Sequence, residues 1–279
     1  MPGETGFASE MTTFKGARGP VKAYLCRPDT KEERPAIVVI HEVWGLVDHT
    51  KDVADRFARE GYVALAPDLY SSDPELASLI TPQNIGTAMG FMQTLPPEKR
   101  ADMAFVQQEL GKQPAPTREV AQRVMAKLYG GMPKEALVQE AVKAVEYLDS
   151  QDYVTKGRVG TMGFCFGGGM SLNVACHTKT AACVVFYGEN PSPIELVDKI
   201  RCPVLGLYGG DDMRINSSLD KLVAAMVQYR KDFQMKVYPG APHAFFNDTN
   251  KATYREEAAR DAWEMTLRFF RQTLQGIGP

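Results

Sequence analysis

The chain has 279 residues, of which 44% are apolar, and its 32 basic and 34 acidic side chains leave a formal net charge of -2. This length fits one large α/β domain, and the balance of charge argues against a nucleic-acid or anionic-membrane binder, which would normally carry a basic face. No stretch approaches the ~18 consecutive apolar residues of a membrane span, and residues 1–15 lack the apolar core of a secretory signal. Five scattered cysteines without a C-x-x-C pair indicate reduced thiols, so we expect a cytoplasmic protein.

The first part of the chain alternates strand and helix patterns. Val21–Cys26 predicts an edge strand, and the β-branched run Ala36–His41 predicts a strand buried on both faces of a parallel sheet. Asp48 is expected to cap the helix that follows, with His49 beside it in solvent. The next short strand is Tyr62–Ala66, and this strand–helix–strand order implies a right-handed crossover.

The alternation is interrupted between Ser71 and Pro133. Seven prolines divide this stretch into short helical pieces that carry methionine, phenylalanine and other apolar residues. A loop of ~60 residues without structure of its own would be improbable. We therefore predict a helical excursion over the sheet at about residues 71–134, which forms a lid and much of the pocket rather than an independent domain.

Beyond the excursion the alternation returns. The predicted elements are a helix at Glu135–Leu148, a strand at Arg158–Met162, a helix near Phe166–His177, strands at Ala181–Phe186, Pro203–Tyr208 and Gln234–Tyr238, and a last helix at about Tyr254–Leu274. Strands that alternate with helices over the whole length predict a single α/β domain, residues 1–279, with a mostly parallel central sheet covered by helices on both faces.

The sharpest motif is Gly163-Phe164-Cys165-Phe166-Gly167, between a strand and an apolar helix start. This is G-x-S-x-G with cysteine in place of serine, in the strand–turn–helix context that the motif requires. Glycines two residues before and after the nucleophile avoid Cβ clashes in a strained turn, and the helix N-terminus favours a thiolate and an oxyanion alike. The competing interpretation is a glycine-rich turn around a buried, inert cysteine, as we expect for Cys26, Cys176, Cys183 and Cys202.

A thiol needs a base, and the base needs an orienting carboxylate. His243 follows a predicted strand in a Pro/Gly-rich loop, whereas His41 ends a strand and could line the same rim. For the carboxylate, Asp212 fits a G-x-x-D-x-x-[VI] turn, while Asp211 should face solvent. The order Cys165, Asp212, His243 is that of the α/β-hydrolase fold.

Five short segments, spread over nearly the whole chain except the excursion, resemble the dienelactone hydrolase (carboxymethylenebutenolidase) family. They are His41-Glu42-Val43-Trp44-Gly45-Leu46, Ala66-Pro67-Asp68-Leu69-Tyr70, Gly160–Gly169, Gly209–Asp212 and Gly240–Phe245. The resemblance implies the α/β-hydrolase fold and a catalytic triad formed by Cys165, Asp212 and His243. It also implies that Glu42 contacts the resting thiol and helps to deprotonate it when substrate arrives.

The resemblance also implies where the substrate binds. The backbone amides of Val43 and Phe166 would form the oxyanion hole, and Trp44 in the same loop could line the pocket. Asn247 stands four residues after the predicted base, where the family's type enzyme has an arginine that holds a substrate carboxylate. A second family arginine lies in an Arg-Glu-x-Ala segment, which Arg118 and the three residues after it resemble.

The sequence thus predicts a cofactor-free, metal-free cysteine hydrolase of esters or lactones that forms an acyl-thioester. Its partner would be a small-molecule substrate, without nucleic acid or membrane, and the protein would be a monomer or small homo-oligomer. Two alternatives stay open: a carboxylesterase for other activated acyl compounds with a less charged pocket, and a non-catalytic thiol redox sensor.

Overall fold

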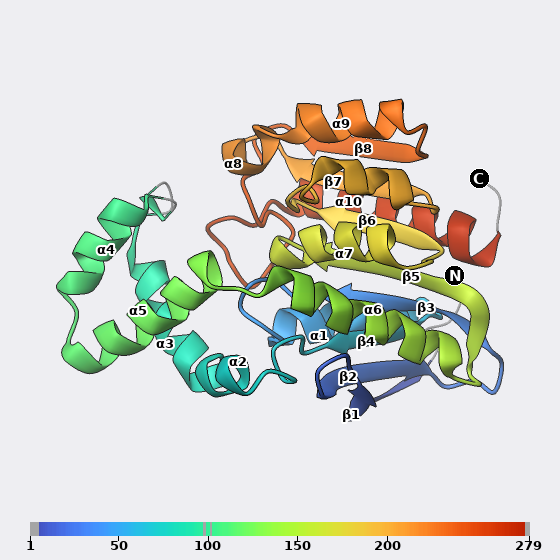
Figure 1. Ribbon diagram of the computed structural model, residues 1–279, viewed down its shortest axis with the longest axis horizontal. Helices are drawn as coiled ribbons and strands as arrows, with labels where there is room; N and C mark the ends of the chain where they lie inside the picture. The colour runs from blue at the N-terminus through green and yellow to red at the C-terminus, as the bar shows by residue number, and fades with distance from the viewer. Residues whose placement is uncertain (1–5, 97–98, 101, 277–279) are drawn as a thin grey trace.

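The computed structural model describes residues 6–96, 99–100 and 102–276. Within these residues eight strands form one sheet in the order β1-β2-β4-β3-β5-β6-β7-β8 (Figure 1). Both β1–β2 and β2–β4 pair antiparallel, and all the other neighbours pair parallel. The strands are β1 (Phe7–Lys15), β2 (Pro20–Pro28), β3 (Arg34–Ile40), β4 (Val63–Pro67), β5 (Val154–Phe164), β6 (Ala182–Phe186), β7 (Val204–Gly209) and β8 (Phe233–Tyr238). The predicted mostly parallel sheet is confirmed.

The antiparallel end of the sheet differs from the sequence prediction. The first strand, β1, was not predicted, because most of its side chains are exposed and its apolar residues do not alternate. It pairs along its whole length with β2. The expectation of an edge strand at Val21–Cys26 is therefore wrong, since β2 lies between β1 and β4 and contributes buried side chains to the core.

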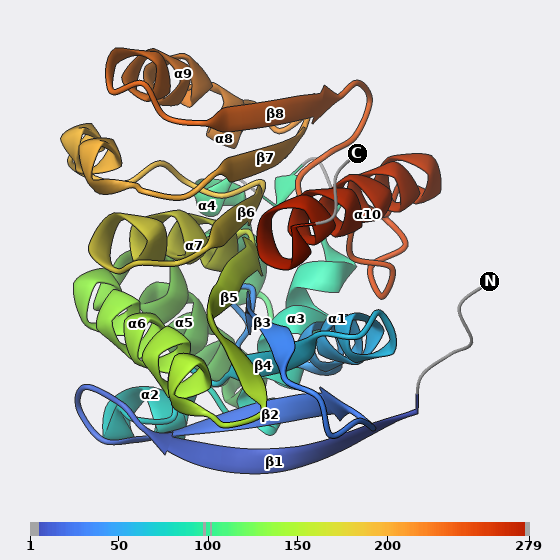
Figure 2. The ribbon, with the colours of Figure 1, turned by 90° about the vertical axis from the view of Figure 1, so that its right-hand side faces the viewer.

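Helices cover both faces of the sheet (Figure 2). On one face α1 (Asp48–Arg59) and α10 (Glu256–Phe270) pack over the strands, and on the other lie α6 (Lys134–Ser150), α7 (Phe166–His177) and α9 (Leu219–Gln228). Helix α1 is strongly amphipathic and buries Val53, Ala54 and Phe57 against the sheet. Three apolar clusters follow from this arrangement: one beneath α1 and α10, one beneath α6, and one between α7, α9 and the neighbouring strands. The smaller elements are η2 (Ile194–Lys199), α8 (Met213–Asn216) and η3 (Arg271–Gln275).

The predicted excursion is helical. It comprises α2 (Pro74–Leu79), α3 (Pro82–Thr94), α4 (Met103–Gly111) and α5 (Ala115–Gly130), hereafter the excursion helices. Prolines stand in the first turn of α2, α3 and α5, where the ring's fixed φ suits a helix and the missing N–H needs no partner. Three of the prolines that interrupt the sequence pattern, Pro74, Pro82 and Pro116, are thus at helix starts.

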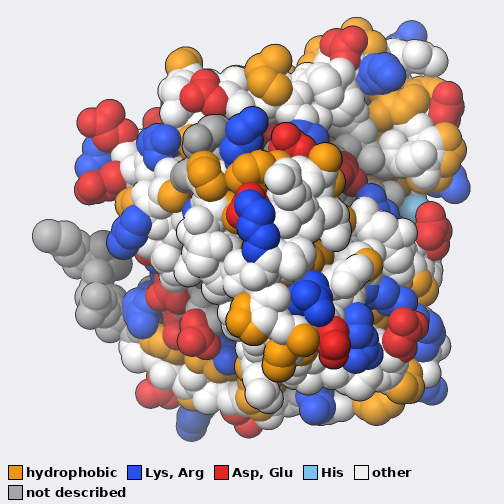
Figure 3. Space-filling view, turned by 90° about the vertical axis from the view of Figure 1, so that its left-hand side faces the viewer, with side chains coloured by type: hydrophobic (Ala, Val, Ile, Leu, Met, Phe, Trp, Pro, Cys, Tyr) orange, Lys and Arg blue, Asp and Glu red, His pale blue; other side chains and the backbone are white. Residues whose placement is uncertain are grey.

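The excursion helices have an apolar core of their own, to which the loop after β3 contributes Val43. Figure 1 shows α3, α4 and α5 beside the main body, on the side where α8 also lies. On the face seen in Figure 3, which includes this side, lysines and arginines are interspersed with aspartates and glutamates. Among the described helices, none combines the length and the hydropathy needed to cross a membrane.

Candidate active site

Cys165 occupies a sharp turn between β5 and α7. Its backbone has φ 54°, in the left-handed region that residues with a Cβ rarely adopt. The turn is fixed by a hydrogen bond from Cys165 N–H to the carbonyl of Phe186 (3.0 Å) and by one from Gly169 N–H to the carbonyl of Cys165 (3.2 Å). The cysteine is partly exposed, whereas the other four cysteines are buried free thiols. The turn therefore leaves Cys165 partly accessible.

The glycines around Cys165 are required by close backbone contacts. A Cβ on Gly163 would lie 2.1 Å from the Gly167 carbonyl oxygen, and one on Gly167 would lie 2.3 Å from the carbonyl oxygen of Ile40. A Cβ on Gly168 would meet the Phe186 carbonyl oxygen at 2.5 Å. The first turn of α7 thus rests on the end of β3, so that the Cys165 turn and the loop that starts at His41 are direct neighbours.

Asp212 and His243 are joined across two loops. Nδ1 of His243 makes a short hydrogen bond with Oδ2 of Asp212. The carboxylate is buried, with 5% of the residue exposed, and its Oδ1 accepts the N–H of Ile215 (3.4 Å) as the N-cap of α8. The loop of His243 is held to the end of β7 by a hydrogen bond from Asp211 N–H to the carbonyl of Ala241 (3.0 Å). As predicted, the Asp211 side chain faces solvent and Asp212 faces the imidazole.

The His243 ring is also a hydrogen-bonding neighbour of the Cys165 thiol. Burial lowers the pKa of His243, but the charge of a Cys165 thiolate and the hydrogen bonds with Asp212 and Cys165 outweigh it, and the pKa rises to about 10. The arrangement therefore favours a protonated imidazole beside the Cys165 sulfur. Such a pair can deliver a nucleophile and then return a proton to a leaving group.

The loop between β3 and α1 faces the same turn. Glu42 is buried, with 5% exposed, and its Oε2 accepts a hydrogen bond of 2.8 Å from Asn247 Nδ2. In the described part of the chain no backbone hydrogen bond engages the N–H of Val43 or of Phe166. Two donors from neighbouring loops are thus available to an oxygen that becomes negatively charged.

Comparison with known proteins covers most of the chain. The sequence profile of the Dienelactone hydrolase family matches residues 21–274. The chain belongs to the dienelactone hydrolase family. It is similar to a Saccharolobus solfataricus protein named "Putative carboxymethylenebutenolidase", with 40% identity over 90% of this chain and 94% of the relative. It is 29% identical to a Bradyrhizobium protein named "Probable 2-oxo-3-(5-oxofuran-2-ylidene)propanoate lactonase", over 91% of this chain and 90% of the relative.

A solved structure confirms the fold assignment. The dienelactone hydrolase from Anabaena variabilis superposes with a TM-score of 0.61 at 16% identity and covers 96% of this chain and 99% of its own. The chain therefore has the α/β-hydrolase fold of its family, and it is a dienelactone hydrolase-like hydrolase.

The residues predicted to hold substrate in this dienelactone hydrolase-like protein lie at different places. Asn247 is 8% exposed and holds Glu42, so its side chain amide is already engaged. Trp44 packs partly against the core of the excursion helices. Arg118 lies in the first turns of α5, and no hydrogen bond or ion pair joins its side chain to another described residue.

The sequence did not single out two tyrosines at this site. Desolvation and then the charge of Cys165 raise the pKa of Tyr129, and the charges of Arg214 and Glu42 also act on its hydroxyl. The end of α5 therefore lies near Cys165, although Tyr129 stays 51% exposed, and Arg118, eleven residues earlier, is about 16 Å further along the helix axis. The ring of Tyr187 lies edge-on against that of His243, with centroids 5.0 Å apart. Neither tyrosine belongs to a local motif. Only the folded chain brings them near Cys165, so the sequence pattern could not identify them.

Two further histidines are buried. His49 is 3% exposed, and its ring packs between Phe164 and Phe246. The expectation of a solvated His49 is therefore wrong, because it lies on the apolar side of α1, whereas Asp48 beside it faces out. His41 is fully buried at the start of the loop that carries Glu42 and Val43.

The remaining cysteines are core thiols, as predicted. Burial raises the pKa of Cys183 to about 11 and that of Cys176 to about 12, and it also raises those of Cys26 and Cys202. Among the described residues no group of three or more His, Cys, Asp or Glu side chains is arranged to hold a metal ion.

Proposed function

We propose that the protein is a cysteine hydrolase of esters or lactones, with Cys165 as nucleophile, His243 as general base and acid, and Asp212 as the group that orients the imidazole. The observation that carries the proposal is the chain of contacts from the Asp212 carboxylate through His243 to a thiol on a left-handed turn. A buried, inert cysteine would need neither the strained backbone nor the pairing of a histidine with a buried carboxylate.

The proposed reaction has two halves. The Cys165 thiolate attacks the carbonyl carbon, and the tetrahedral oxyanion is held by the amides of Val43 and Phe166. The C–O bond breaks, the leaving alkoxide or enolate takes the proton of the His243 imidazolium, and an acyl-thioester remains. Neutral His243 then removes a proton from water, which attacks the thioester and releases the carboxylic acid and the thiolate.

Glu42 is proposed to act at the thiol before the first half-reaction. Besides burial, the charge of its carboxylate helps to raise the pKa of the Tyr187 and Tyr129 hydroxyls, and the charge of Cys165 acts on the same two groups. Glu42 and Cys165 therefore lie near the same two side chains. In the structure its Oε2 is turned to Asn247. A carboxylate that leaves this hydrogen bond would accept the thiol proton as substrate enters and return it to the thiolate after the product leaves.

The substrate class follows from what Asn247 does. A guanidinium at this position could bind a substrate carboxylate bidentately, whereas the neutral Asn247 amide is buried and already bonded to Glu42. We therefore favour esters and lactones whose acyl part is uncharged next to this position. The name of the Bradyrhizobium relative describes a lactone that carries a carboxylate, and such a lactone is the contrasting substrate to test.

The experiment compares turnover of an aryl acetate, a neutral enol-lactone and a carboxylate-bearing lactone by the wild type and by Cys165→Ala. We expect turnover that disappears in the variant, and a higher kcat/KM for the two neutral substrates. Undiminished turnover by Cys165→Ala contradicts the nucleophile. Reversible peroxide oxidation of Cys165 without any ester hydrolysis would support the thiol-sensor alternative instead.

A further inference from the structure

The fully buried His41 connects the loop of Glu42 and Val43 to the loop that follows β4. Its Nδ1 lies 2.6 Å from the carbonyl oxygen of Glu42, and its Nε2 lies 3.3 Å from the amide nitrogen of Leu69. The ring also packs against Tyr70, with centroids 4.8 Å apart, and lies nearly parallel to the ring of Phe166. It therefore contacts both loops that supply the proposed oxyanion donors.

These two contacts determine where the proton of His41 resides. The N–H of Leu69 can only donate, so Nε2 must be the unprotonated acceptor. The ring proton is then on Nδ1, which donates to the Glu42 carbonyl. Burial lowers the pKa of His41, although the charges of Asp68 and Glu42 act in the opposite direction. The ring is thus a neutral donor with a fixed tautomer.

The hydrogen bond at the Glu42 carbonyl sets the direction of the next amide. In a trans peptide the C=O of one residue and the N–H of the next point in opposite directions. The Glu42 carbonyl is held by His41 and by Gly45 N–H (3.2 Å), and the Val43 carbonyl accepts the Tyr70 hydroxyl (3.0 Å). The peptide that carries Val43 N–H therefore has both adjoining carbonyls fixed, and its N–H points away from the His41 ring.

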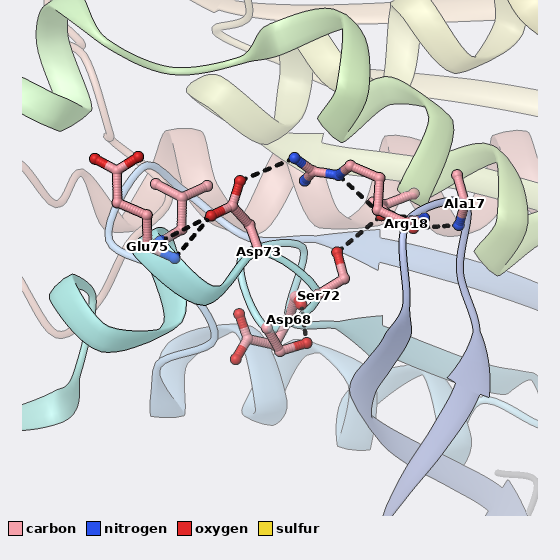
Figure 4. A network of polar contacts seen from close by, with 9 residues as sticks. Ala17, Arg18, Asp68, Ser72, Asp73 and Glu75 are labelled. Atoms are coloured by element: carbon pink, nitrogen blue, oxygen red, sulfur yellow. Dashed lines mark hydrogen bonds and ion pairs between the residues drawn. The ribbon is translucent and has the colours of Figure 1, made fainter.

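The loop after β4, which carries Leu69 and Tyr70, is held in place by further hydrogen bonds. Asp68 N–H donates to the carbonyl of Lys22 (2.8 Å), and Ser72 Oγ donates to Glu140 Oε1 (2.8 Å). The fully buried Glu140 carboxylate also accepts the backbone N–H groups of Ala17 and Arg18. Figure 4 shows the part of this network that joins Ser72 to Ala17 and Arg18, and so ties the loop after β4 to the β1–β2 turn.

We propose that His41 is a positioning residue that orients the Val43 N–H toward the oxyanion, with Tyr70 as its second support. The inference rests on the proposed function, because it gives the amide of Val43 a role in ester hydrolysis. His41 itself does not touch the substrate. It acts through the peptide bond between Glu42 and Val43.

Two variants separate the two hydrogen bonds of the ring. In His41→Asn the amide nitrogen can replace Nδ1 as donor to the Glu42 carbonyl. In His41→Gln the longer amide can place an acceptor near Leu69 N–H, but no donor remains at the Nδ1 position. We expect kcat for an aryl acetate within about threefold of wild type in His41→Asn, and about 10- to 100-fold lower in His41→Gln with an unchanged KM.

Alkylation of Cys165 by iodoacetamide serves as the control measurement, because this reaction needs the thiol but develops no charge on an oxygen atom. A general disturbance of the site would slow alkylation as well as ester hydrolysis, whereas a misdirected Val43 N–H would slow ester hydrolysis alone. We expect the alkylation rate in both variants to stay within about twofold of wild type. The inference is overturned if His41→Gln keeps the wild-type kcat, or if its kcat and its alkylation rate fall together. Should His41→Gln not fold, Tyr70→Phe decides in the same way: a fall in kcat with unchanged alkylation supports the inference, and an unchanged kcat overturns it.

The same assays distinguish failure of the proposed function. If the wild type hydrolyses no ester, or if Cys165→Ala matches the wild type, the proposed function falls and this inference falls with it. If Cys165→Ala is inactive but His41→Gln is fully active, the proposed function stands and only the role of His41 is lost.

Discussion

Asn247 Nδ2 donates a hydrogen bond of 2.8 Å to Oε2 of Glu42, and this contact joins the loop of His243 to the loop of Val43. The direction of the amide is fixed, because Asn247 Oδ1 accepts both the N–H (3.1 Å) and the hydroxyl (2.6 Å) of Thr249. A neutral donor thus occupies the position where the family's type enzyme has a cation. Glu42 is held in place without a positive charge that could also attract a substrate carboxylate.

Replacing this neutral donor by a cation should change the substrate preference. We expect Asn247→Arg to raise kcat/KM for a carboxylate-bearing lactone, relative to a neutral lactone, by about tenfold, the size of one charge-assisted hydrogen bond. Asn247→Gln is the control, since it changes length but not charge. Kinetics on the two lactones measure the ratio, and an equal ratio in the arginine variant and the control would contradict our account of this position.

The charge of His243 should make the stability of the fold depend on pH. Its pKa rises from 6.5 to about 10 on folding, so its contribution is fully present below pH 6.5 and is lost as the pH rises through 10. His243→Asn keeps a donor near Asp212 but cannot be protonated. We expect the difference in thermal midpoint between wild type and this variant to be largest at pH 6 and smallest at pH 10. A difference that grows with pH would have the wrong sign.

The ring of Tyr187 should matter more than its hydroxyl. The ring lies edge-on against His243, whereas the buried hydroxyl makes no side-chain hydrogen bond with a described residue of the site. We expect Tyr187→Phe to keep kcat within about twofold and Tyr187→Leu to lower it by about tenfold, as loss of an aromatic pair allows. Phenylalanine and leucine would both have to adopt the positive φ of 38° at this residue, so backbone strain cannot account for a difference in kcat between the two variants. Equal kcat values in the two would show that the ring does not position His243.

The close contact between α7 and the end of β3 should be intolerant of a single methyl group. A Cβ on Gly167 would lie 2.3 Å and 2.4 Å from two backbone carbonyl oxygens, so we expect Gly167→Ala to lower the free energy of unfolding by about 3 kcal/mol. Gly86 in α3 is the matched control, since a Cβ there meets no atom within 4 Å. Gly86→Ala should raise the free energy of unfolding by about 0.5–1 kcal/mol. Urea titration measures both, and a Gly167→Ala protein as stable as the wild type would contradict the described packing.

The sequence predicted the parts of the fold and site that depend on local pattern. The turn at Cys165 is encoded by its glycines, and the choice of Asp212 over Asp211 follows from turn spacing, so both could be found without coordinates. Residues that reach the site through tertiary folding could not be found in this way. Tyr129 comes from the end of an excursion helix and Tyr187 from the end of β6, and neither is part of a recognisable motif.

The errors have physical reasons as well. His49 stands beside Asp48 and Lys51, so its neighbours suggest a polar surface, but the helical period turns it toward Phe164. The strand β1 lies at the edge of the sheet, and its exposed residues carry no alternation that could identify it. In both cases the structure depends on residues that are distant in the sequence. The local pattern around His49 and in β1 therefore could not predict it.

The central claim is that Cys165 carries the acyl group, and intact-protein mass spectrometry under turnover tests it most directly. Asp212→Asn should slow the water step, because His243 loses the carboxylate that orients it, so that an acyl-thioester accumulates. With an aryl acetate we predict one acetyl group per chain on Cys165 in Asp212→Asn, and none when Cys165→Ala is added to it. Acetylation that persists at the same level after Cys165→Ala, or ester hydrolysis that continues at the wild-type rate in that variant, would contradict the account.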